Sequence, residues 1–214
     1  MDDFKFETIL DFDNHISNSI YGYDLLHNLI VNISSFFIKK DTKVIDLGTT
    51  TGKLPIELNN EYDCEVIGYD IISDNFIKPK SKKVKLIQDD ITKIEYINSN
   101  LYTSIFTLQF LPINDKKLIL NKVYNCLNDN GAFIVCEKEY ADSALIQEVF
   151  TFSNYQNKLN NFSPNDILKK EKQLRHSMNC LTNEQNIRIY KEAGFKRIDV
   201  FFQSLNFKGY ILTK

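Results

Sequence analysis

The sequence predicts a single α/β domain in which helices cover both faces of a seven-stranded, mostly parallel sheet. Three observations support this prediction. The 214-residue chain is long enough to bury a substantial core, short β-branched segments alternate with longer amphipathic ones, and no Pro-, Gly- or Ser-rich linker divides it. Strands that alternate with crossover helices are typical of a parallel sheet with covered faces.

Five short segments rich in β-branched and aromatic residues are the predicted parallel strands. Such side chains fit the pleated surface of a sheet. These strands cover residues 43–47, 65–69, 84–88, 101–107 and 132–137. Two further segments of this kind, 196–203 and 206–212, lie close together near the end of the chain, and we expect them to form an antiparallel pair at the sheet edge.

Apolar residues at helical spacing predict helices between these strands. The first covers residues 23–37, before the first strand. The second covers 114–127 and is expected to stop at Gly131, because a glycine readily adopts the left-handed conformation of a helix cap. The third covers 182–193, with the Thr182 hydroxyl as its N-cap.

Charge and hydropathy argue against several classes of partner. The 26 basic and 28 acidic residues give a net charge of −2, which supplies no general field for a nucleic-acid backbone or an anionic membrane. No apolar stretch approaches the roughly 20 residues of a membrane helix, and the start of the chain does not resemble a signal peptide. We therefore expect a cytoplasmic protein with a small-molecule substrate and no membrane partner, and the charge does not support a nucleic-acid partner.

The cysteines do not suggest a metal or disulfide site. No C-x-x-C pair occurs, and only three histidines could join the thiols as ligands. The thiols are expected to be small buried groups at Cys64, Cys126, Cys136 and Cys180.

The loop after the first strand is the first candidate for a ligand site, because ligands of open parallel sheets bind beyond the carboxyl ends of the strands. It reads D-L-G-T-T-T-G-K from Asp46, and Gly48 and Gly52 would let the backbone turn sharply into the next helix. The spacing matches neither G-x-G-x-x-G nor a P-loop. This pattern suits a nucleoside without a pyrophosphate, although a plain strand-to-helix turn would also explain it.

Carboxylates follow the next two strands. Asp70 ends the second strand, 24 residues after Asp46, where an acid can accept hydrogen bonds from a ribose diol. Asp90 follows the third strand, where it could accept a hydrogen bond from an adenine amine beside an apolar contact from Ile91. The alternatives are that Asp70 caps the following turn and that the neighbouring Asp89 is a cap.

These three motifs, V-I-D-L-G-T-T-T-G, G-Y-D and Q-D-D-I, together resemble the class I S-adenosylmethionine-dependent methyltransferases. Five further segments are similar to the carboxy-S-adenosylmethionine synthase family, at residues 19–23, 106–111, 131–138, 193–195 and 202–207. The resemblance implies a Rossmann-like fold, S-adenosylmethionine as cofactor and a homodimer. Members of that synthase family use prephenate to make a carboxylated sulfonium for tRNA wobble-uridine modification.

The resemblance also implies the roles of individual residues. Tyr23 would contact the amino-acid end of the cofactor, Asp70 the ribose, and Asp90 with Ile91 the adenine. The expected cofactor-binding residues are Tyr23, Asp46, Gly48, Thr49, Thr50, Gly52, Asp70, Ile71, Asp90, Ile91 and Thr107. The whole chain would be one cofactor-binding domain, with a helical lid at 1–40 and a helical acceptor-pocket insertion at 140–181.

Two positions depart from the synthase family. Ile105 stands where that family has Asn, and Glu171 stands where it has a carboxylate-binding Arg. An Arg clamp on a carboxylate contributes about 1.5 to 3 kcal/mol, whereas an acid repels the same ligand. Lys170, Lys172 or Arg175 could substitute after a small helix shift.

Methyl transfer to a small molecule is therefore the predicted reaction. The alternatives are carboxy-S-adenosylmethionine synthesis, another non-methylating use of the sulfonium such as cyclisation of the aminocarboxypropyl arm, and binding without turnover. The sulfonium methyl is already electrophilic, so the enzyme mainly aligns the acceptor and excludes water. An acceptor that must lose a proton needs a base, for which His15 and Glu137 are the predicted residues, with Asp13 and Glu171 as further candidates. The alternatives are an exposed histidine at His15 and a solvated charge run at Glu137.

Overall fold

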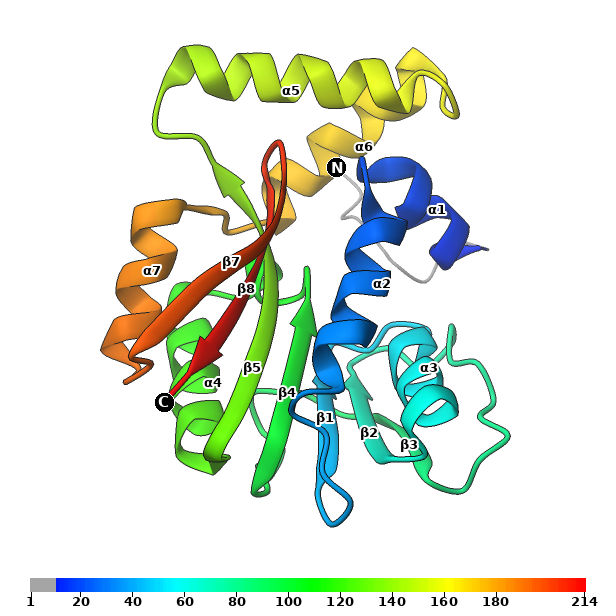
Figure 1. Ribbon diagram of the computed structural model, residues 1–214. Coiled ribbons are helices and arrows are strands. Elements are labelled where there is room, and N and C mark those ends of the chain that lie inside the picture. Colours follow the sequence, from blue (N-terminus) through cyan, green and yellow to red (C-terminus); the bar gives the residue numbers. More distant parts are fainter. Residues whose placement is uncertain (1–10) are drawn as a thin grey trace.

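Residues 11–214 are described in the computed structural model, which places an eight-stranded sheet between layers of helices (Figure 1). The strand order is β3-β2-β1-β4-β5-β8-β7, and the short β6 pairs with the end of β5. The strands are β1 (Lys43–Leu47), β2 (Glu65–Asp70), β3 (Val84–Gln88), β4 (Ser99–Ile105), β5 (Leu127–Tyr140), β6 (Leu181–Thr182), β7 (Arg197–Ser204) and β8 (Phe207–Thr213).

The pairing confirms the predicted fold class. β1 pairs in parallel with β2 and β4, β2 with β3, and β4 with β5, whereas β8 is antiparallel to both β5 and β7. The predicted hairpin at the sheet edge is therefore confirmed. The sheet has one strand more than the seven predicted, because the two-residue β6 is too short to leave a periodic signal in the sequence.

Helices cover both faces of the sheet (Figure 1). Alternate residues of each strand point to opposite faces, so Ile45 of β1 joins one hydrophobic core and Val44 joins the other. The first core includes side chains of α4 and α7, and the second includes those of α2 and α3. The helices are α1 (Phe12–Ser19), α2 (Tyr23–Ser34), α3 (Lys53–Tyr62), the 3-10 helix η2 (Leu108–Phe110), α4 (Ile113–Cys126), α5 (Ala144–Lys158), α6 (Pro164–Ser177) and α7 (Asn183–Glu192).

The prediction for the end of the second helix is wrong. The helix α4 ends at Cys126, its C-cap Leu127 is extended, and the chain enters β5 directly. The left-handed conformation falls on Asn130, with a φ of 62°, and not on Gly131. A Cβ at Gly131 would lie 2.8 Å from the Asn100 carbonyl oxygen, so this glycine is required by the close approach of β4 and β5 and not by a helix cap.

The prediction for the start of the last helix is confirmed. Thr182 caps α7: its hydroxyl accepts a hydrogen bond from the backbone N–H of Gln185, and the Gln185 side chain accepts one from the backbone N–H of Thr182. This reciprocal arrangement is a capping box.

The helices α1, α5 and α6 lie together at the end of the sheet where the parallel strands have their carboxyl ends (Figure 1). They belong to the two segments, 1–40 and 140–181, that were predicted as a lid and an insertion. No helix of the described part of the chain is both long and apolar enough to cross a bilayer.

Candidate functional site

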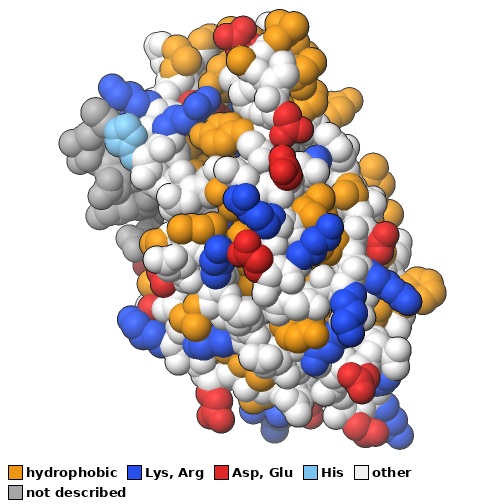
Figure 2. Space-filling model, turned by 90° about the vertical axis from the view of Figure 1, so that its left-hand side faces the viewer, with side chains coloured by type: hydrophobic (Ala, Val, Ile, Leu, Met, Phe, Trp, Pro, Cys, Tyr) orange, Lys and Arg blue, Asp and Glu red, His pale blue; other side chains and the backbone are white. Residues whose placement is uncertain are grey.

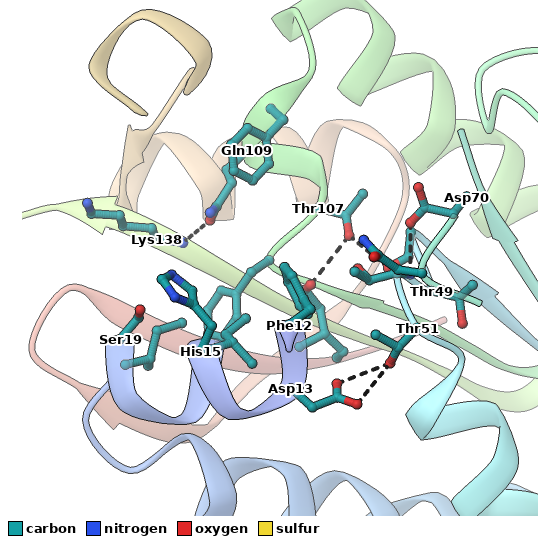
Figure 3. Close-up of a pocket in the computed structure, with 18 of the residues that line it drawn as sticks. Phe12, Asp13, His15, Ser19, Thr49, Thr51, Asp70, Thr107, Gln109 and Lys138 are labelled. Atoms are coloured by element: carbon teal, nitrogen blue, oxygen red, sulfur yellow. Dashed lines mark hydrogen bonds between the residues drawn. The ribbon is translucent and has the colours of Figure 1, made fainter. Parts of the chain in front are cut away.

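A cavity of about 270 Å³ lies at the carboxyl ends of the parallel strands, with α1 along one side of it (Figure 3). The loops after β1, β2, β3 and β4 contribute residues to its wall, as do α1, α6 and the end of β5. Side chains from segments far apart in the sequence therefore line one cavity, as a sheet with this strand order predicts.

The loop after β1 is shaped by its first glycine. The backbone N–H groups of Gly48 and Thr49 both donate to the carbonyl oxygen of Tyr69, at 2.8 and 2.9 Å. Gly48 has a φ of 83°, and a Cβ there would lie 2.1 Å from Oγ1 of Thr107. Only glycine can both adopt this conformation and allow Thr107 so close.

Asp70 is held by this loop. Its Oδ2 accepts a hydrogen bond from the backbone N–H of Thr50 at 2.8 Å, and its Oδ1 accepts one from the backbone N–H of Ile72 at 3.1 Å. Burial raises the pKa of Asp70, and these hydrogen bonds oppose the rise. Each carboxylate oxygen retains a lone pair for a further donor, so Asp70 could accept two hydroxyl groups in the cavity that it lines.

Two further acids lie in the same part of the cavity. Asp46 is only 3% exposed, its Oδ1 accepts a hydrogen bond from the Thr103 hydroxyl at 2.6 Å, and burial raises its pKa to about 6. Asp13 of α1 accepts from the Thr51 hydroxyl with both carboxylate oxygens, at 3.1 and 3.3 Å. This contact joins α1 to the loop after β1 (Figure 3).

Asp90 and Ile91 also line the cavity. Asp90 accepts hydrogen bonds from the backbone N–H and hydroxyl of Thr92, at 2.9 and 2.7 Å, and forms an ion pair with Lys93 at 2.8 Å. The hydrogen bonds from Lys93 and Thr92 lower the pKa of Asp90 to about 2. Asp89 accepts from the backbone N–H of Asp90 at 2.7 Å, so both acids organise this turn.

The opposite part of the cavity carries cationic side chains. Lys138, Lys158 and Lys170 line it together with Glu171. Nζ of Lys158 lies 3.0 Å from Oε1 of Glu171, and Nζ of Lys138 lies 3.9 Å from Oε2. Burial alone would raise the pKa of Glu171, but Lys138 and Lys158 lower it.

His15 lies at this cationic side of the cavity. Its Nε2 contacts Nζ of Lys170, and its ring packs against Phe162 with centroids 5.1 Å apart. Burial, and then the charges of Lys170 and Lys158, lower the pKa of His15 to about 4. The imidazole is therefore neutral near pH 7 and can accept a proton only as a weak base.

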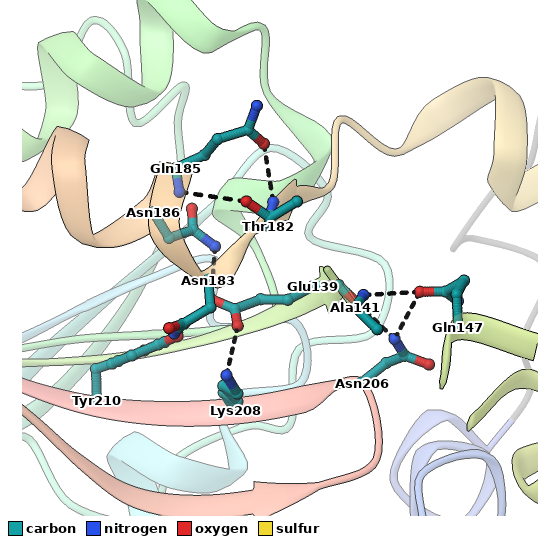
Figure 4. Close-up of polar contacts among 10 residues, drawn as sticks. All are labelled: Glu139, Ala141, Gln147, Thr182, Asn183, Gln185, Asn186, Asn206, Lys208 and Tyr210. Carbon is teal, nitrogen blue, oxygen red and sulfur yellow. Dashed lines mark hydrogen bonds and ion pairs between the residues drawn. The ribbon is translucent and has the colours of Figure 1, made fainter. Parts of the chain in front are cut away.

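Glu137 lies outside the cavity. Its side chain is 1% exposed and forms an ion pair with Lys116 at 2.6 Å, on the face of the sheet covered by α4. The next acid on this strand, Glu139, belongs to the same polar region: it accepts a hydrogen bond from Asn186 at 2.8 Å and one from Tyr210, and pairs with Lys208 at 3.2 Å (Figure 4). The structure therefore does not place Glu137 in the wall of the cavity, and its role in catalysis stays a prediction.

Most of the residues expected to bind the cofactor share this one cavity. The exception is Gly52, which starts α3 with a φ of 81° and whose Cβ would lie 2.4 Å from Leu86, so it is required by packing. The expected residues in the cavity wall are Tyr23, Asp46, Gly48, Thr49, Thr50, Asp70, Ile71, Asp90, Ile91 and Thr107. Their contacts with a cofactor stay a prediction.

Sequence reasoning missed Lys138 and Lys158 as cavity residues. Of the three possible substitutes for the missing arginine, Lys170 lines the cavity, whereas Lys172 and Arg175 do not. No signal in the sequence separates Lys158 from the other basic residues, because its place depends on how α5 and α6 fold back over the sheet.

Within the described residues, no group of three or more His, Cys, Asp or Glu side chains could hold a metal ion. All four cysteines are free thiols.

Comparison with known proteins identifies relatives over nearly the whole chain. Residues 38–194 match a family described as a methyltransferase domain. The chain is 33% identical to the carboxy-S-adenosyl-L-methionine synthase of Staphylococcus epidermidis, over 97% of this chain and 94% of that protein. Relatives with the same name in Nautilia profundicola and Shewanella oneidensis are each 29% identical over 99% of this chain.

Solved structures show the same fold at low identity. Human N-acetylserotonin methyltransferase in complex with SAM superposes with a TM-score of 0.57 at 16% identity, covering 81% of this chain and 47% of that one. The Haemonchus contortus phosphoethanolamine N-methyltransferase 2, in complex with phosphomonomethylethanolamine and S-adenosylhomocysteine, gives 0.59 at 19% identity, covering 85% and 39%. This chain thus spans less than half of either protein.

Proposed function

Because this chain belongs to the family of S-adenosylmethionine-dependent methyltransferase domains that includes the carboxy-S-adenosyl-L-methionine synthases, it is an enzyme that uses this cofactor, and we propose how its cavity does so. The cofactor occupies the part of the cavity lined by Asp46 and Asp70. The sulfonium methyl group is transferred to a small molecule in the part lined by Lys138, Lys158 and Lys170.

The acid-lined part of the cavity fits the charge of the cofactor. S-Adenosylmethionine carries a sulfonium and an ammonium but only one carboxylate. Asp46 forms no ion pair with a described residue, although it is 3% exposed, and burial raises its pKa to about 6. A cation in the cavity would favour the ionised form of Asp46 and lower this pKa.

The single observation that carries the proposal is the environment of Asp70. Its two oxygens are fixed by backbone N–H donors from two loops and have lone pairs left for the cavity. Two adjacent hydroxyl groups, as in a ribose, match such a pair of acceptors. Asp90 and Ile91, both in the loop after β3, complete a site for the adenine.

This chain's residues align the acceptor and exclude water, while the bound cofactor supplies the electrophilic methyl group. If the acceptor loses a proton, His15 is the proposed base, because it lines the cavity and its low pKa keeps it neutral near pH 7. Glu137, also predicted as a base, is separated from the cavity, and we propose a structural role for it.

The direct test is incubation of the purified protein with S-adenosylmethionine and mass spectrometry of the products. Methyl transfer yields S-adenosylhomocysteine and an acceptor heavier by one methylene unit. Release of methylthioadenosine, the thioether that leaves when the aminocarboxypropyl arm is displaced, without any acceptor would instead indicate cyclisation of that arm. Failure to bind either S-adenosylmethionine or S-adenosylhomocysteine would refute the proposal.

A second candidate function is the synthesis of carboxy-S-adenosylmethionine. The names of the relatives favour it, as do the cations of the cavity, which suit a carboxylated ligand. Against it, Ile105 and Glu171 line the cavity where that family has Asn and Arg. The same incubation with prephenate distinguishes the two reactions. A product that is the cofactor with one added carboxylate group would show that the enzyme makes carboxy-S-adenosylmethionine and not a methylated acceptor.

We also propose that the protein acts as a cytoplasmic homodimer. The helix α5 leaves large apolar side chains uncovered, with Leu145 68%, Val149 47% and Phe152 64% exposed. Apolar side chains gather at the upper end of the molecule, where α5 lies (Figure 2). Such a face supports an interface between copies. Light scattering of the wild type and of Phe152→Asp tests it, with a shift to the monomer expected in the variant.

A further inference from the structure

The turn that follows β3 is held by two side chains that do not belong to the cavity wall. Lys122 comes from α4, and Tyr96 lies later in the same loop. Asp90 and Ile91 of the turn line the cavity, whereas Lys122 and Tyr96 do not. We propose that Lys122 and Tyr96 are positioning residues that hold this turn in the shape that recognises adenine. This inference rests on the proposed function, because it concerns the adenine end of the same cofactor site.

Lys122 reaches from α4 to the backbone of the turn. Its Nζ donates a hydrogen bond to the carbonyl oxygen of Thr92 at 2.7 Å. The same ammonium group lies over the ring of Tyr96, 5.2 Å from the ring centroid. Thr92 in turn holds Asp90, because its backbone N–H and its hydroxyl both donate to Oδ1 of that residue, at 2.9 and 2.7 Å. A chain of contacts therefore runs from α4 through Thr92 to the carboxylate of Asp90.

Tyr96 holds the neighbouring carbonyl group. Its hydroxyl donates to the carbonyl oxygen of Ile91 at 2.9 Å, and burial raises the pKa of Tyr96, so the hydroxyl keeps its proton. Its ring stacks on that of Tyr102 in β4, which is fully buried, with centroids 6.0 Å apart and planes 19° apart. The sheet thus anchors Tyr96, and the successive carbonyl groups of Ile91 and Thr92 are each held by a donor from outside the cavity wall.

The other contacts of the turn are weaker supports for Asp90. The backbone N–H groups of Lys93 and Ile94 both donate to the carbonyl oxygen of Asp90, at 2.8 and 3.1 Å. The ion pair between Asp90 and Lys93 is formed by a lysine whose side chain is 78% exposed, and solvent screens such a pair. The hydrogen bond from the ammonium group of Lys122 is partly buried and charge-assisted. We therefore expect Lys122 to fix the turn more firmly than Lys93 does.

The position of Asp90 determines which base the site accepts. The amine of adenine can donate a hydrogen bond to a carboxylate. Hypoxanthine has a carbonyl group at that place, which cannot donate and is repelled by the negative charge. A carboxylate held at hydrogen-bond distance therefore discriminates between the two bases, and one on a loosened turn discriminates less. Lys122 and Tyr96 should thus affect the preference between bases as well as the affinity.

The test is calorimetric titration of the full-length protein with S-adenosylhomocysteine and with S-inosylhomocysteine, in which a carbonyl group replaces the adenine amine. The wild type should bind S-adenosylhomocysteine roughly tenfold more tightly. Lys122→Met should reduce this preference about threefold. Tyr96→Phe should reduce it less, because the ring beneath Lys122 remains. The double variant should reduce it by less than the product of the two single effects, since both residues hold one turn.

A matched control and a rescue separate this role from folding. Lys117→Met removes another lysine of α4, whose partner is Glu192 of α7 at 2.9 Å, and should keep the wild-type preference. Lys122→Arg retains a cationic donor and should keep most of the preference. Thermal melts report whether each variant is folded. In the ligand-free protein, amide hydrogen exchange at Lys93 and Ile94 should be faster in Lys122→Met than in the wild type or Lys117→Met.

Several outcomes would overturn the inference alone. They are an unchanged preference in Lys122→Met, an equal loss of affinity for both ligands in that variant, the same change of preference in Lys117→Met, and unchanged amide exchange in the turn. A wild type that bound neither ligand would instead refute the proposed function, and the recognition of adenine with it.

Discussion

The backbone N–H of Thr50 donates a 2.8 Å hydrogen bond to Oδ2 of Asp70, and so joins the loop after β1 to the carboxyl end of β2. Thr50 has a positive φ of 51°, which is unfavourable for a β-branched residue. The hydrogen bond to Asp70 helps to hold this conformation. The carboxylate therefore serves two purposes: it shapes the loop, and it presents the rest of its lone pairs to the cavity.

Asp70→Ala should weaken binding of S-adenosylhomocysteine by about 1 to 3 kcal/mol, because the ribose hydroxyls would lose their acceptor. Isothermal titration calorimetry measures this difference. Asp74→Ala, at an exposed position four residues later, is the matched control and should bind normally. Equal affinity in Asp70→Ala and wild type would place the ribose elsewhere.

The affinity for S-adenosylmethionine should rise as the pH is raised from 5 to 7, because Asp46 ionises near pH 6 and its negative charge attracts the cationic cofactor. Asp46→Asn should bind more weakly at pH 7 and lose this part of the pH dependence. Titrations at several pH values compare the two proteins, and identical profiles would contradict a cofactor contact at Asp46.

The raised pKa of Asp46 also predicts that the stability of the ligand-free protein depends on pH. Its pKa is raised from 3.8 in the unfolded chain to about 6 in the folded one, so the folded state binds more protons between these values. The contribution of Asp46 to the free energy of unfolding is therefore present below pH 4 and lost as the pH rises through 6. Asn cannot titrate, so thermal melts of Asp46→Asn should lack this decline.

Gly48→Ala should destabilise the protein more than Gly22→Ala. Both glycines have a φ near 82°, so both substitutions introduce backbone strain of about 1 to 3 kcal/mol. At Gly22 the nearest atom to the new Cβ is 3.5 Å away, whereas at Gly48 it is Oγ1 of Thr107 at 2.1 Å. Urea unfolding measures the difference in stability between the two variants. The double variant Gly48→Ala/Thr107→Gly removes the clash and should be more stable than it would be if the effects of its two substitutions simply added.

Glu137→Gln should lower stability and leave the pH profile of turnover unchanged, because Glu137 is paired with Lys116 and not exposed to the cavity. Lys116→Met should lower the free energy of unfolding by about 3 to 5 kcal/mol, since it leaves a buried carboxylate without its cation. Urea unfolding and rates of turnover at pH 6 to 9 check both effects. If the turnover rate of Glu137→Gln no longer changed with pH on one side of the wild-type optimum, Glu137 would be the catalytic base after all.

The sequence by itself determined the fold and one half of the site. β-Branched segments located β1, β2 and β3 to within a residue, and Asp46, Asp70 and Asp90 stood at or just after their ends. Because parallel strands have their carboxyl ends at one edge of the sheet, linear order alone was enough to bring these acids into one cavity.

Only the tertiary structure decided the other half. Whether Glu137 or Lys138 faces the cavity depends on the pleat and register of β5, because adjacent residues of a strand point to opposite faces. Lys158 meets Glu171 only because α5 and α6 fold back over the end of the sheet. Such contacts between distant surface-type residues leave no periodic pattern in the sequence, and they place Lys138 and Lys158 beside the carboxylate of Glu171.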